Sequence, residues 1–301
     1  DPGRRIQGIT FRRVHRRAPG EGEVEIRVEA ASLNYKDYLK VVGRLNPIAT
    51  RDTYFEGVVG LECVGEIVRT GPEVEEFEVG DRVTGFVRDS FQSYATAEAA
   101  LVVKAPRNSG PEAAGIATAY LSAIQGLETV GSLREGERVL IHQASGGVGL
   151  AAIDVARSAG AEIFATAGSE EKREFLRGMG IGNVYDSRSP SFAGKIREHT
   201  GGEGVDVVLG AVSGVIQQES LELLRAGGRY VDLGKKEIVE NIGLPRRAFN
   251  RNLVYAAIDI DRLILDRPDA IRSMLAEAVQ RIESGNLHLS EGRLFPAAEI
   301  R

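Results

Sequence analysis

Cysteine is almost absent from this 301-residue chain, which contains only Cys63. A single cysteine excludes an intrachain disulfide and any CxxC metal knuckle. Such sparing use of cysteine is typical of a reducing compartment, so we expect a cytoplasmic protein. Cys63 itself is most simply interpreted as a small buried residue.

Long apolar runs and an excess of positive charge are also missing. No run approaches the ~20 apolar residues that span a bilayer, so no membrane association is expected. The formal net charge of −5 gives no bulk attraction to nucleic acid. Arginines do cluster near the N-terminus, at positions 4, 5, 12, 13, 16 and 17. We interpret them as a solvated face, with docking of an acidic protein as the alternative.

An initiator methionine and a signal peptide are absent from the start of the chain, which reads DPGRR. We therefore expect the chain to be a piece of a longer protein. Its length suggests about two domains of roughly 150 residues each.

The first hundred residues have the pattern of short strands. In Glu23–Ser32 the apolar residues Val24, Ile26 and Val28 alternate with charged ones, which is the period of a half-buried strand. Cys63–Gly71 and Asp81–Val87 are similar runs, and Gly-Pro and Gly-Asp turn signals separate them. The pattern predicts a barrel or sandwich.

The pattern changes at about Pro111, where apolar strand-like runs begin to alternate with helical stretches. The expected strands are Arg138–His142, Glu162–Ala167, Val205–Gly210, Arg229–Gly234 and Leu253–Asp259. Such alternation predicts a parallel sheet covered on both faces. A last helix over Arg267–Gly285 is expected to pack back onto the first domain.

A glycine-rich loop joins the strand ending at His142 to the next helix. Aligned to the GxGxxG dinucleotide fingerprint, its positions are Ala144, Gly146 and Gly149. The strand–turn–helix context is the one that the fingerprint requires. Gly146 would let the backbone approach a pyrophosphate, and Gly149 would let helix and strand pack closely.

The end of the second strand indicates which dinucleotide binds. NAD sites place an acid about 20 residues after the glycines, for the ribose 2′-hydroxyl. Here Ala167, Gly168 and Ser169 stand at that point, followed by Lys172 and Arg173. A hydroxyl and two cations suit a 2′-phosphate, so we predict NADPH rather than NADH. Glu170 and Glu171 argue against this choice unless they face solvent.

These features together resemble the medium-chain dehydrogenase/reductase superfamily, and within it the enoyl reductase domains of modular and mycobacterial-type polyketide synthases. The segments that carry the resemblance include Ser32–Asp37, Gly60–Gly65, Val139–Ile153, Leu223–Ile238 and Ala256–Asp261. The resemblance implies an α/β chain with a GroES-like β-rich barrel domain (residues 1–109 and 265–301) and a doubly wound Rossmann domain (residues 110–264). It also implies that the closing strand of the family is cut short after residue 301.

Zinc is not expected, by the same resemblance. Zinc members use a cysteine and a Gly-His-Glu motif, whereas this chain has Leu61 at the histidine position and the Ser32–Asp37 segment at the cysteine position. A catalytic zinc site needs about three protein ligands. The four histidines are scattered, at positions 15, 142, 199 and 288.

The resemblance implies transfer of a hydride from NADPH to the β-carbon of an enoyl thioester. Lys235 and Asp259 would act as the proton donor and its orienting partner. The family tyrosine that is proposed as α-carbon donor aligns with Leu45 in an unusually long loop, so Tyr38 and Tyr54 are alternatives. The cofactor-binding residues would be Asn34, Thr118, Ser145, Gly146, Gly147, Val148, Gly149, Ala167, Gly168, Ser169, Lys172, Arg173, Arg188, Gly210, Ala211, Val212, Leu233 and Gly234.

Partners follow from the same resemblance: an acyl carrier protein bearing the enoyl chain on phosphopantetheine, neighbouring synthase domains, and a second copy in a homodimer. Two other interpretations stay open. One is a free-standing zinc-independent quinone oxidoreductase or acryloyl-CoA-type reductase. The other is an NADPH-binding protein without catalysis.

Overall fold

The structure is a computed structural model that describes residues 9–290 and 292–299, and it divides the chain into two compact units. Unit 1 comprises residues 1–121 and 260–301, and unit 2 comprises residues 122–259. The first division falls within helix α2 (Ile116–Ile124). The predicted boundary after residue 264 falls inside helix α8 (Ile260–Asp266), which begins the second part of unit 1.

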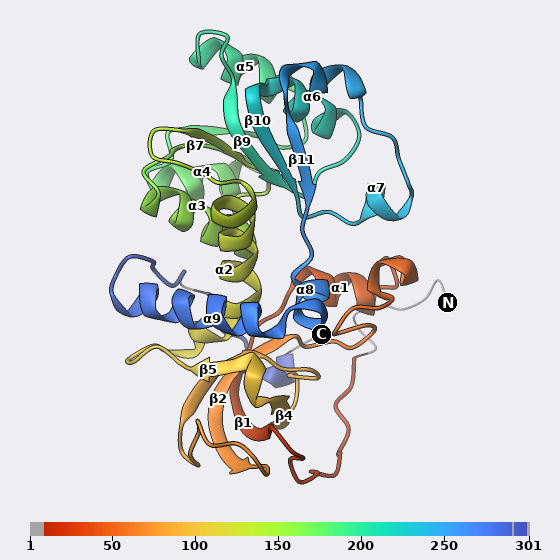
Figure 1. The fold of residues 1–301 in the computed structure, drawn as a ribbon, viewed down its shortest axis with the longest axis vertical. Helices are drawn as coiled ribbons and strands as arrows, with labels where there is room; N and C mark the ends of the chain where they lie inside the picture. Colours follow the sequence, from red (N-terminus) through yellow and green to blue (C-terminus); the bar gives the residue numbers. More distant parts are fainter. Residues whose placement is uncertain (1–8, 291, 300–301) are drawn as a thin grey trace. The chain divides into compact units, whose positions relative to one another are not determined.

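Unit 1 is built on a five-stranded antiparallel sheet with the order β4-β1-β2-β3-β5 (Figure 1). Its strands are β1 (Glu23–Ala31), β2 (Glu62–Thr70), β3 (Arg82–Phe86), β4 (Tyr94–Glu98) and β5 (Val102–Lys104). The first three coincide closely with the strands predicted from alternation. Their inward residues, among them Val24, Ile26, Ile67 and Val83, form one core cluster.

Unit 1 also contains helices and short turns. They are α1 (Tyr35–Val41), the first part of α2, α8 and α9 (Pro268–Glu283), with 3₁₀ turns η2 (Pro47–Thr50), η3 (Ala99–Leu101), η4 (Pro111–Gly115) and η7 (Ala297–Glu299). Helix α9 contacts η3 and β5, so the last long helix does pack onto the β-rich part. Turn η4 contacts β1, β2 and β3, which explains why residues 110–121 belong to unit 1.

Unit 2 contains a six-stranded parallel sheet with the order β11-β10-β9-β6-β7-β8 (Figure 1). Its strands are β6 (Arg138–Ile141), β7 (Glu162–Ala167), β8 (Asn183–Asp186), β9 (Val205–Gly210), β10 (Leu224–Asp232) and β11 (Val254–Ala257). Counted from the first strand, this is the 3-2-1-4-5-6 order of a doubly wound sheet. The predicted α/β class, with one β-rich and one doubly wound part, is confirmed.

The connections of unit 2 are mostly helical. They are α3 (Gly147–Ser158), α4 (Glu170–Gly178), α5 (Ser191–His199), α6 (Val215–Leu223), α7 (Lys236–Val239), the π-helical turn η5 (Gln125–Val130) and the 3₁₀ turn η6 (Arg246–Arg251). Helices α3 and α4 end before glycines with positive φ, as expected. Helix α6 does not: Leu224 is already extended and starts β10, so its predicted glycine cap is wrong.

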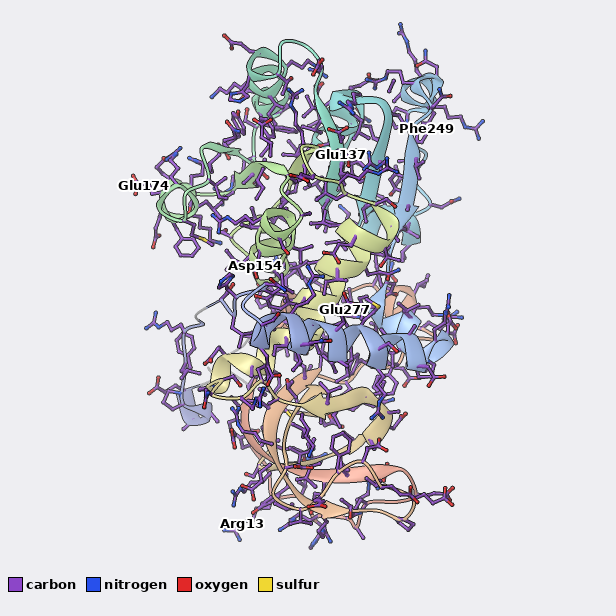
Figure 2. The ribbon with its side chains drawn as sticks, turned by 60° about the vertical axis from the view of Figure 1, so that its left-hand side comes forward. Arg13, Glu137, Asp154, Glu174, Phe249 and Glu277 are labelled. Atoms are coloured by element: carbon purple, nitrogen blue, oxygen red, sulfur yellow. The ribbon has the colours of Figure 1, made fainter. Side chains whose placement is uncertain are left out.

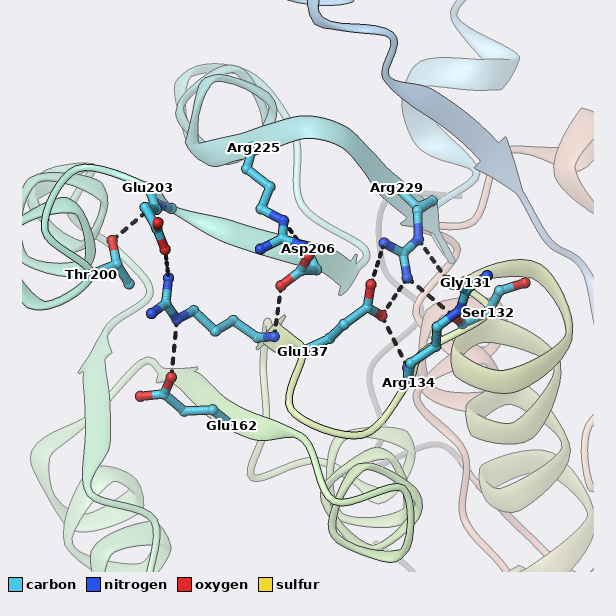
Figure 3. A network of polar contacts seen from close by, with 12 residues as sticks. Gly131, Ser132, Arg134, Glu137, Glu162, Thr200, Glu203, Asp206, Arg225 and Arg229 are labelled. Carbon is cyan, nitrogen blue, oxygen red and sulfur yellow. Dashed lines mark hydrogen bonds and ion pairs between the residues drawn. The ribbon is translucent and has the colours of Figure 1, made fainter.

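The amino ends of the parallel strands are held together by a network of charged side chains (Figure 3). The carboxylate of Asp206 in β9 accepts a hydrogen bond from the backbone N of Arg138 in β6 (2.9 Å) and pairs with Arg225 (2.5 Å). In β10, Arg229 forms two hydrogen bonds with Glu137 (3.0 and 2.6 Å). This network joins the strands at the amino edge of the sheet. The opposite, carboxyl edge is occupied by loops.

The arginine-rich segment before β1 is partly bound to the sheet. Arg16 makes a bidentate hydrogen bond with Glu25 (2.8 and 2.7 Å), and Arg69 makes a second one with the same carboxylate (2.5 and 2.8 Å). Glu25 is only 2% exposed. Arg12 and Arg13 are exposed, and Arg13 extends outward from the unit in Figure 2. Some of the cluster is therefore structural, beyond the solvated face expected.

Replacement of Glu25 by Gln is expected to lower the free energy of unfolding by about 2 kcal/mol at pH 7, discounted because both arginines are partly exposed. The hydrogen bonds from Arg16 and Arg69 lower the pKa of Glu25 to about 2. A carboxyl whose pKa is depressed by folding stabilises the protein above its unfolded-state pKa, and this stability is lost as pH falls toward the folded value. Urea unfolding should show the difference shrinking by about half at pH 3.

The matched control for this prediction is Glu21→Gln, since Glu21 is exposed on the preceding turn. It removes the same formal charge without touching either arginine. An E25Q effect that stays constant between pH 7 and pH 3, or that E21Q reproduces, would contradict the assignment of the stability to these ion pairs.

Candidate functional site

The predicted cofactor residues of unit 2 gather at the carboxyl edge of the parallel sheet. The order of the strands reverses between β6 and β9, and doubly wound sheets bind ligands outside the carboxyl ends of the strands at such a point. The loops that follow β6 and β9 adjoin there, because His142 N donates to the Leu209 oxygen (2.9 Å). A Cβ on Gly210 would lie 2.8 Å from the Cβ of His142, so glycine permits this approach.

The glycine-rich loop after β6 is a tight turn. Gly146 N donates to the Gln143 oxygen (2.9 Å), and Ala144 N donates to the Thr166 oxygen of β7 (2.9 Å). A Cβ on Gly149 would lie 2.6 Å from the Cα of Ala144, so α3 can pack against the loop only with glycine there. Gly149 therefore occupies the close-packing position that its place in the motif predicted.

The outer side of this loop is open. A Cβ on Gly147 would meet no atom within 4 Å, and one on Gly146 would meet only the Gln143 oxygen at 3.4 Å. Within the described part of the chain, no side chain caps the start of α3. Its first N–H groups, at Gly147, Val148 and Gly149, are thus available to an anion together with the positive end of the helix dipole. The loop, with Ser145 beside it, fits the pyrophosphate of a dinucleotide.

A buried histidine, which we did not place in the site from sequence, lies directly beneath this loop. His142 is 3% exposed; its Nδ1 lies 3.0 Å from the Thr166 hydroxyl, and its Nε2 lies 2.8 Å from the Ser220 hydroxyl. Burial lowers the pKa of His142 to about 3, so the ring is neutral at physiological pH. Its position immediately after an apolar strand was the available signal.

The residues at the tip of β7 are arranged around the start of α4. Ala167 is buried, and Ser169 caps the helix by accepting a hydrogen bond from Lys172 N (3.4 Å). The Lys172 side chain is exposed. Arg188 is also exposed, and its Nε lies 3.4 Å from where a Cβ of Gly168 would stand. Both exposed cations therefore lie near the tip of β7.

Arg173 is less available than the sequence suggested. It donates to Glu170 (3.0 and 2.7 Å) and to the Ala167 oxygen (3.1 Å), and it lies 3.5 Å from Asp186. Its side chain is 16% exposed. Glu170 is exposed as expected, yet it pairs with Arg173 and Arg177. Arg173 therefore supports the strand tip through these acids and is not free to meet a ligand.

The loops after β9 and β10 lie beside each other. Leu233 N donates to the Gly210 oxygen (2.8 Å), and a Cβ on Gly234 would lie 3.4 Å from the Cα of Ala211. Val212 continues the loop after β9. The five predicted positions Gly210, Ala211, Val212, Leu233 and Gly234 thus form one segment of the carboxyl edge.

The structure brings together Lys235 and Asp259, the predicted proton donor and its partner. They form an ion pair, with side chains 23% and 29% exposed. Asp232 supports this arrangement: it is 2% exposed and accepts hydrogen bonds from the Tyr255 hydroxyl (2.5 Å) and from Gly234 N (2.6 Å). Burial raises the pKa of Asp232 against the opposing effect of these two donors. The buried carboxylate of Asp232 therefore holds the turn that carries Lys235.

The two candidate tyrosines of unit 1 differ in environment. Tyr54 is 8% exposed, and burial together with nearby Glu98 raises the pKa of its phenol. Its backbone N donates to the Asp261 oxygen (3.2 Å), which anchors the long loop to α8. Tyr38 lies on α1, half-buried, with its ring stacked on Tyr35. A phenol that holds its proton more tightly is a poorer donor, so Tyr54 suits the predicted role less well.

Asn34 and Thr118, the predicted nicotinamide neighbours, both contact one buried carboxylate in unit 1. Glu62 accepts a hydrogen bond from Asn34 Nδ2 (2.9 Å) and one from Thr118 N (2.8 Å). A second buried acid, Asp37, accepts from the backbone N of Asn34 (3.0 Å) and of Gly60 (2.9 Å). The Ser32–Asp37 and Gly60–Gly65 segments are thus joined through carboxylates.

The described side chains form no metal site. Across residues 9–290 and 292–299, the structure contains no group of three or more His, Cys, Asp or Glu side chains placed to hold an ion. Cys63 is buried, and burial raises the pKa of its thiol to about 12.

Comparison with known proteins matches both parts of the chain to domain families. Residues 20–107 match the family described as "Alcohol dehydrogenase GroES-like domain", and residues 147–280 match "Zinc-binding dehydrogenase". The chain is 39% identical over 296 residues to a mycocerosic acid synthase-like polyketide synthase of Mycobacterium tuberculosis. That alignment covers 98% of this chain but 14% of the synthase, so the chain spans only a small part of the curated relatives it matches.

A solved enoyl reductase decides the family. The crystal structure of CurK enoyl reductase is 36% identical, has a TM-score of 0.88, and is matched over 98% of this chain and 90% of that one. The chain belongs to the enoyl reductases of the medium-chain dehydrogenase/reductase superfamily. Members of this family are oxidoreductases that act on carbon–carbon double bonds.

A second solved structure matches a shorter part of the chain. The nucleotide-binding subdomain of the enoylreductase domain of PpsC from Mycobacterium tuberculosis is 41% identical, with a TM-score of 0.56. The match covers 58% of this chain and 98% of that one. The resemblance to polyketide synthase enoyl reductases is thereby confirmed.

Proposed function

We propose that this chain reduces the α,β-double bond of an enoyl thioester with NADPH, as a domain of a synthase that makes polyketides or lipids. The observation that carries the proposal is the Lys235–Asp259 ion pair, which lies beside the nucleotide-type loops at the carboxyl edge in a chain of the enoyl reductase family. The enoyl chain would arrive on the phosphopantetheine of an acyl carrier protein. Neighbouring domains, a cytoplasmic location and a homodimer belong to the same proposal. Among the described helices, none has the length and apolarity needed to cross a bilayer.

The residues of the chain would each supply one part of the chemistry. NADPH, when bound, would supply the hydride for the β-carbon. Lys235 would place its ammonium where negative charge develops on the thioester oxygen, or give a proton to the α-carbon. Asp259 would hold that ammonium in place. The N–H groups that start α3 would hold the pyrophosphate.

The experiment that tests this function compares substrates. Oxidation of NADPH is followed with a crotonyl-pantetheine thioester and, separately, with a small quinone. Rapid turnover of the thioester and slow turnover of the quinone is the expected result. The opposite ratio would establish a quinone reductase, and tight NADPH binding without turnover of either would establish a binding protein.

The preference for NADPH is tested at the two exposed cations. The double substitution Lys172→Ala and Arg188→Ala is expected to raise the Kd for NADPH by at least about tenfold, since charge-assisted hydrogen bonds to a phosphate are the strong ones. The Kd for NADH should stay unchanged. Titration of cofactor fluorescence measures both, with exposed Lys195→Ala as the control. An equal loss for the two cofactors would show that these cations do not read the 2′-phosphate.

A further inference from the structure

Glu62 is a buried carboxylate to which the proposed mechanism assigns no role. It starts β2, is 1% exposed, and has no cationic side chain paired with it among the described residues. Its hydrogen bonds come from Asn34 Nδ2 (2.9 Å) and Thr118 N (2.8 Å). Burial raises the pKa of Glu62 to about 7, opposed by these two donors and by the hydroxyls of Thr118 and Ser32. A buried acid without a countercharge is costly, which calls for a functional reason.

The carboxylate decides which atom Asn34 presents to a ligand. An ionised carboxylate only accepts hydrogen bonds, whereas a carboxamide has one donor end and one acceptor end. Because Nδ2 is turned toward Glu62, the acceptor of the Asn34 side chain is Oδ1. This oxygen faces the backbone N of Asp37 in the capping box of α1, and a carbonyl oxygen has a second lone pair for a further partner. Such an acceptor suits the ribose hydroxyls or the carboxamide NH₂ of a nicotinamide riboside.

Thr118 gives a second, independent indication of a ligand. Its backbone N is bound by Glu62, but its hydroxyl approaches the same carboxylate without forming a hydrogen bond of normal geometry. The buried Thr118 Oγ1 has no hydrogen-bond partner within residues 9–290 and 292–299. Buried polar atoms are nearly always satisfied, so an orphaned one indicates a missing partner.

We infer that Glu62 is a positioning residue for the nicotinamide half of the cofactor. It holds the Asn34 amide with Nδ2 toward the carboxylate and Oδ1 as its acceptor, and it fixes the first turn of α2, so that Asn34 and Thr118 are preorganised for the nicotinamide riboside. This inference rests on the proposed NADPH-dependent function. It assigns Glu62 no contact with the substrate or with the transferred hydride.

The test uses Glu62→Gln, Glu66→Gln and the reversed pair Asn34→Asp with Glu62→Gln, all at pH 8. In E62Q the amide cannot accept from both N–H donors, so Asn34 is free to flip. Glu66 lies on the same strand, pairs with Arg27 at the surface, and gives the matched control. In the reversed pair, the new amide can accept from Thr118 N and donate to the new carboxylate, which again presents an acceptor to the cofactor.

The readouts are the Kd for NADPH by fluorescence, the thermal midpoint of the chain without cofactor, and kcat and KM. E62Q is expected to raise the Kd about tenfold, as for a lost hydrogen bond to a charged group, while E66Q leaves it unchanged. The reversed pair should return the Kd to within about threefold of the original, a recovery that loss of packing alone would not give.

The inference would be overturned if E62Q bound NADPH with the same Kd as the original chain. It would also be overturned if E66Q raised the Kd as much as E62Q does. If E62Q does not fold, the test depends on the reversed pair. A Kd for NADPH in the reversed pair as high as that of Asn34→Ala would then overturn the inference. Turnover of the original chain is measured separately. Binding without turnover would refute the proposed enoyl reduction but leave the Glu62 comparison valid, whereas failure to bind NADPH at all would overturn both.

Discussion

Replacement of Lys235 by Met is expected to lower kcat for reduction of a crotonyl-pantetheine thioester by about 100-fold, the usual range for a group that moves a proton or stabilises developing charge. Methionine keeps much of the length of the side chain but removes the ammonium that pairs with Asp259. Because the side chain is partly exposed, stability should change little. The Kd for NADPH should stay within about twofold.

Steady-state kinetics on the purified chain check this expectation. Lys236→Met is the matched control, because the neighbouring lysine is exposed and starts α7. The stereochemistry of the reduced product at the α-carbon is recorded as well. An unchanged rate together with unchanged stereochemistry would remove Lys235 from the mechanism and leave Tyr38 as the candidate donor.

Substitution of Gly146 by Ala should raise the Kd for NADPH by about 30-fold without a comparable loss of stability. The added methyl group meets only the Gln143 oxygen, at 3.4 Å, so the loop itself accommodates it. It would, however, occupy the space through which a pyrophosphate approaches the backbone. Fluorescence titration and thermal unfolding separate the two effects.

Gly149→Ala provides the contrasting case. There the Cβ would lie 2.6 Å from the backbone of Ala144, so the folded state itself must shift. We expect a lower thermal midpoint as well as weaker binding. A lower thermal midpoint in G146A would show that the loop is not open at this position. An unchanged Kd for NADPH in G146A would show that the phosphates bind elsewhere.

The fold could be predicted largely because periodicity reports burial. Alternation in Glu23–Ala31 and the apolar runs around Val139–Ile141 correspond to strands β1 and β6. Ends of elements were less predictable, as at α6, where Leu224 passes straight into a strand despite the glycines that follow. A glycine signals a helix cap only when the chain needs a left-handed residue at that point.

The candidate site was predictable where a motif has a fixed spacing or where the family resemblance supplied residues. The spacing identified the glycine-rich loop, and the resemblance implied Lys235 and Asp259, which do lie together. The behaviour of Arg173 was not predictable, because its pairing with Asp186 joins helix α4 to the end of strand β8. Glu62 and His142 were missed as parts of the site for the same reason: their partners, such as Thr118 and Ser220, are distant in sequence.

Because His142 is neutral, the glycine-rich loop above it should respond to pH differently from the groups that take part in catalysis. An imidazole with a pKa of about 3 stays uncharged throughout the range in which an ordinary histidine titrates. The charge beneath the glycine-rich loop therefore stays the same across that range. We expect changes in turnover near neutral pH to originate in other titrating groups.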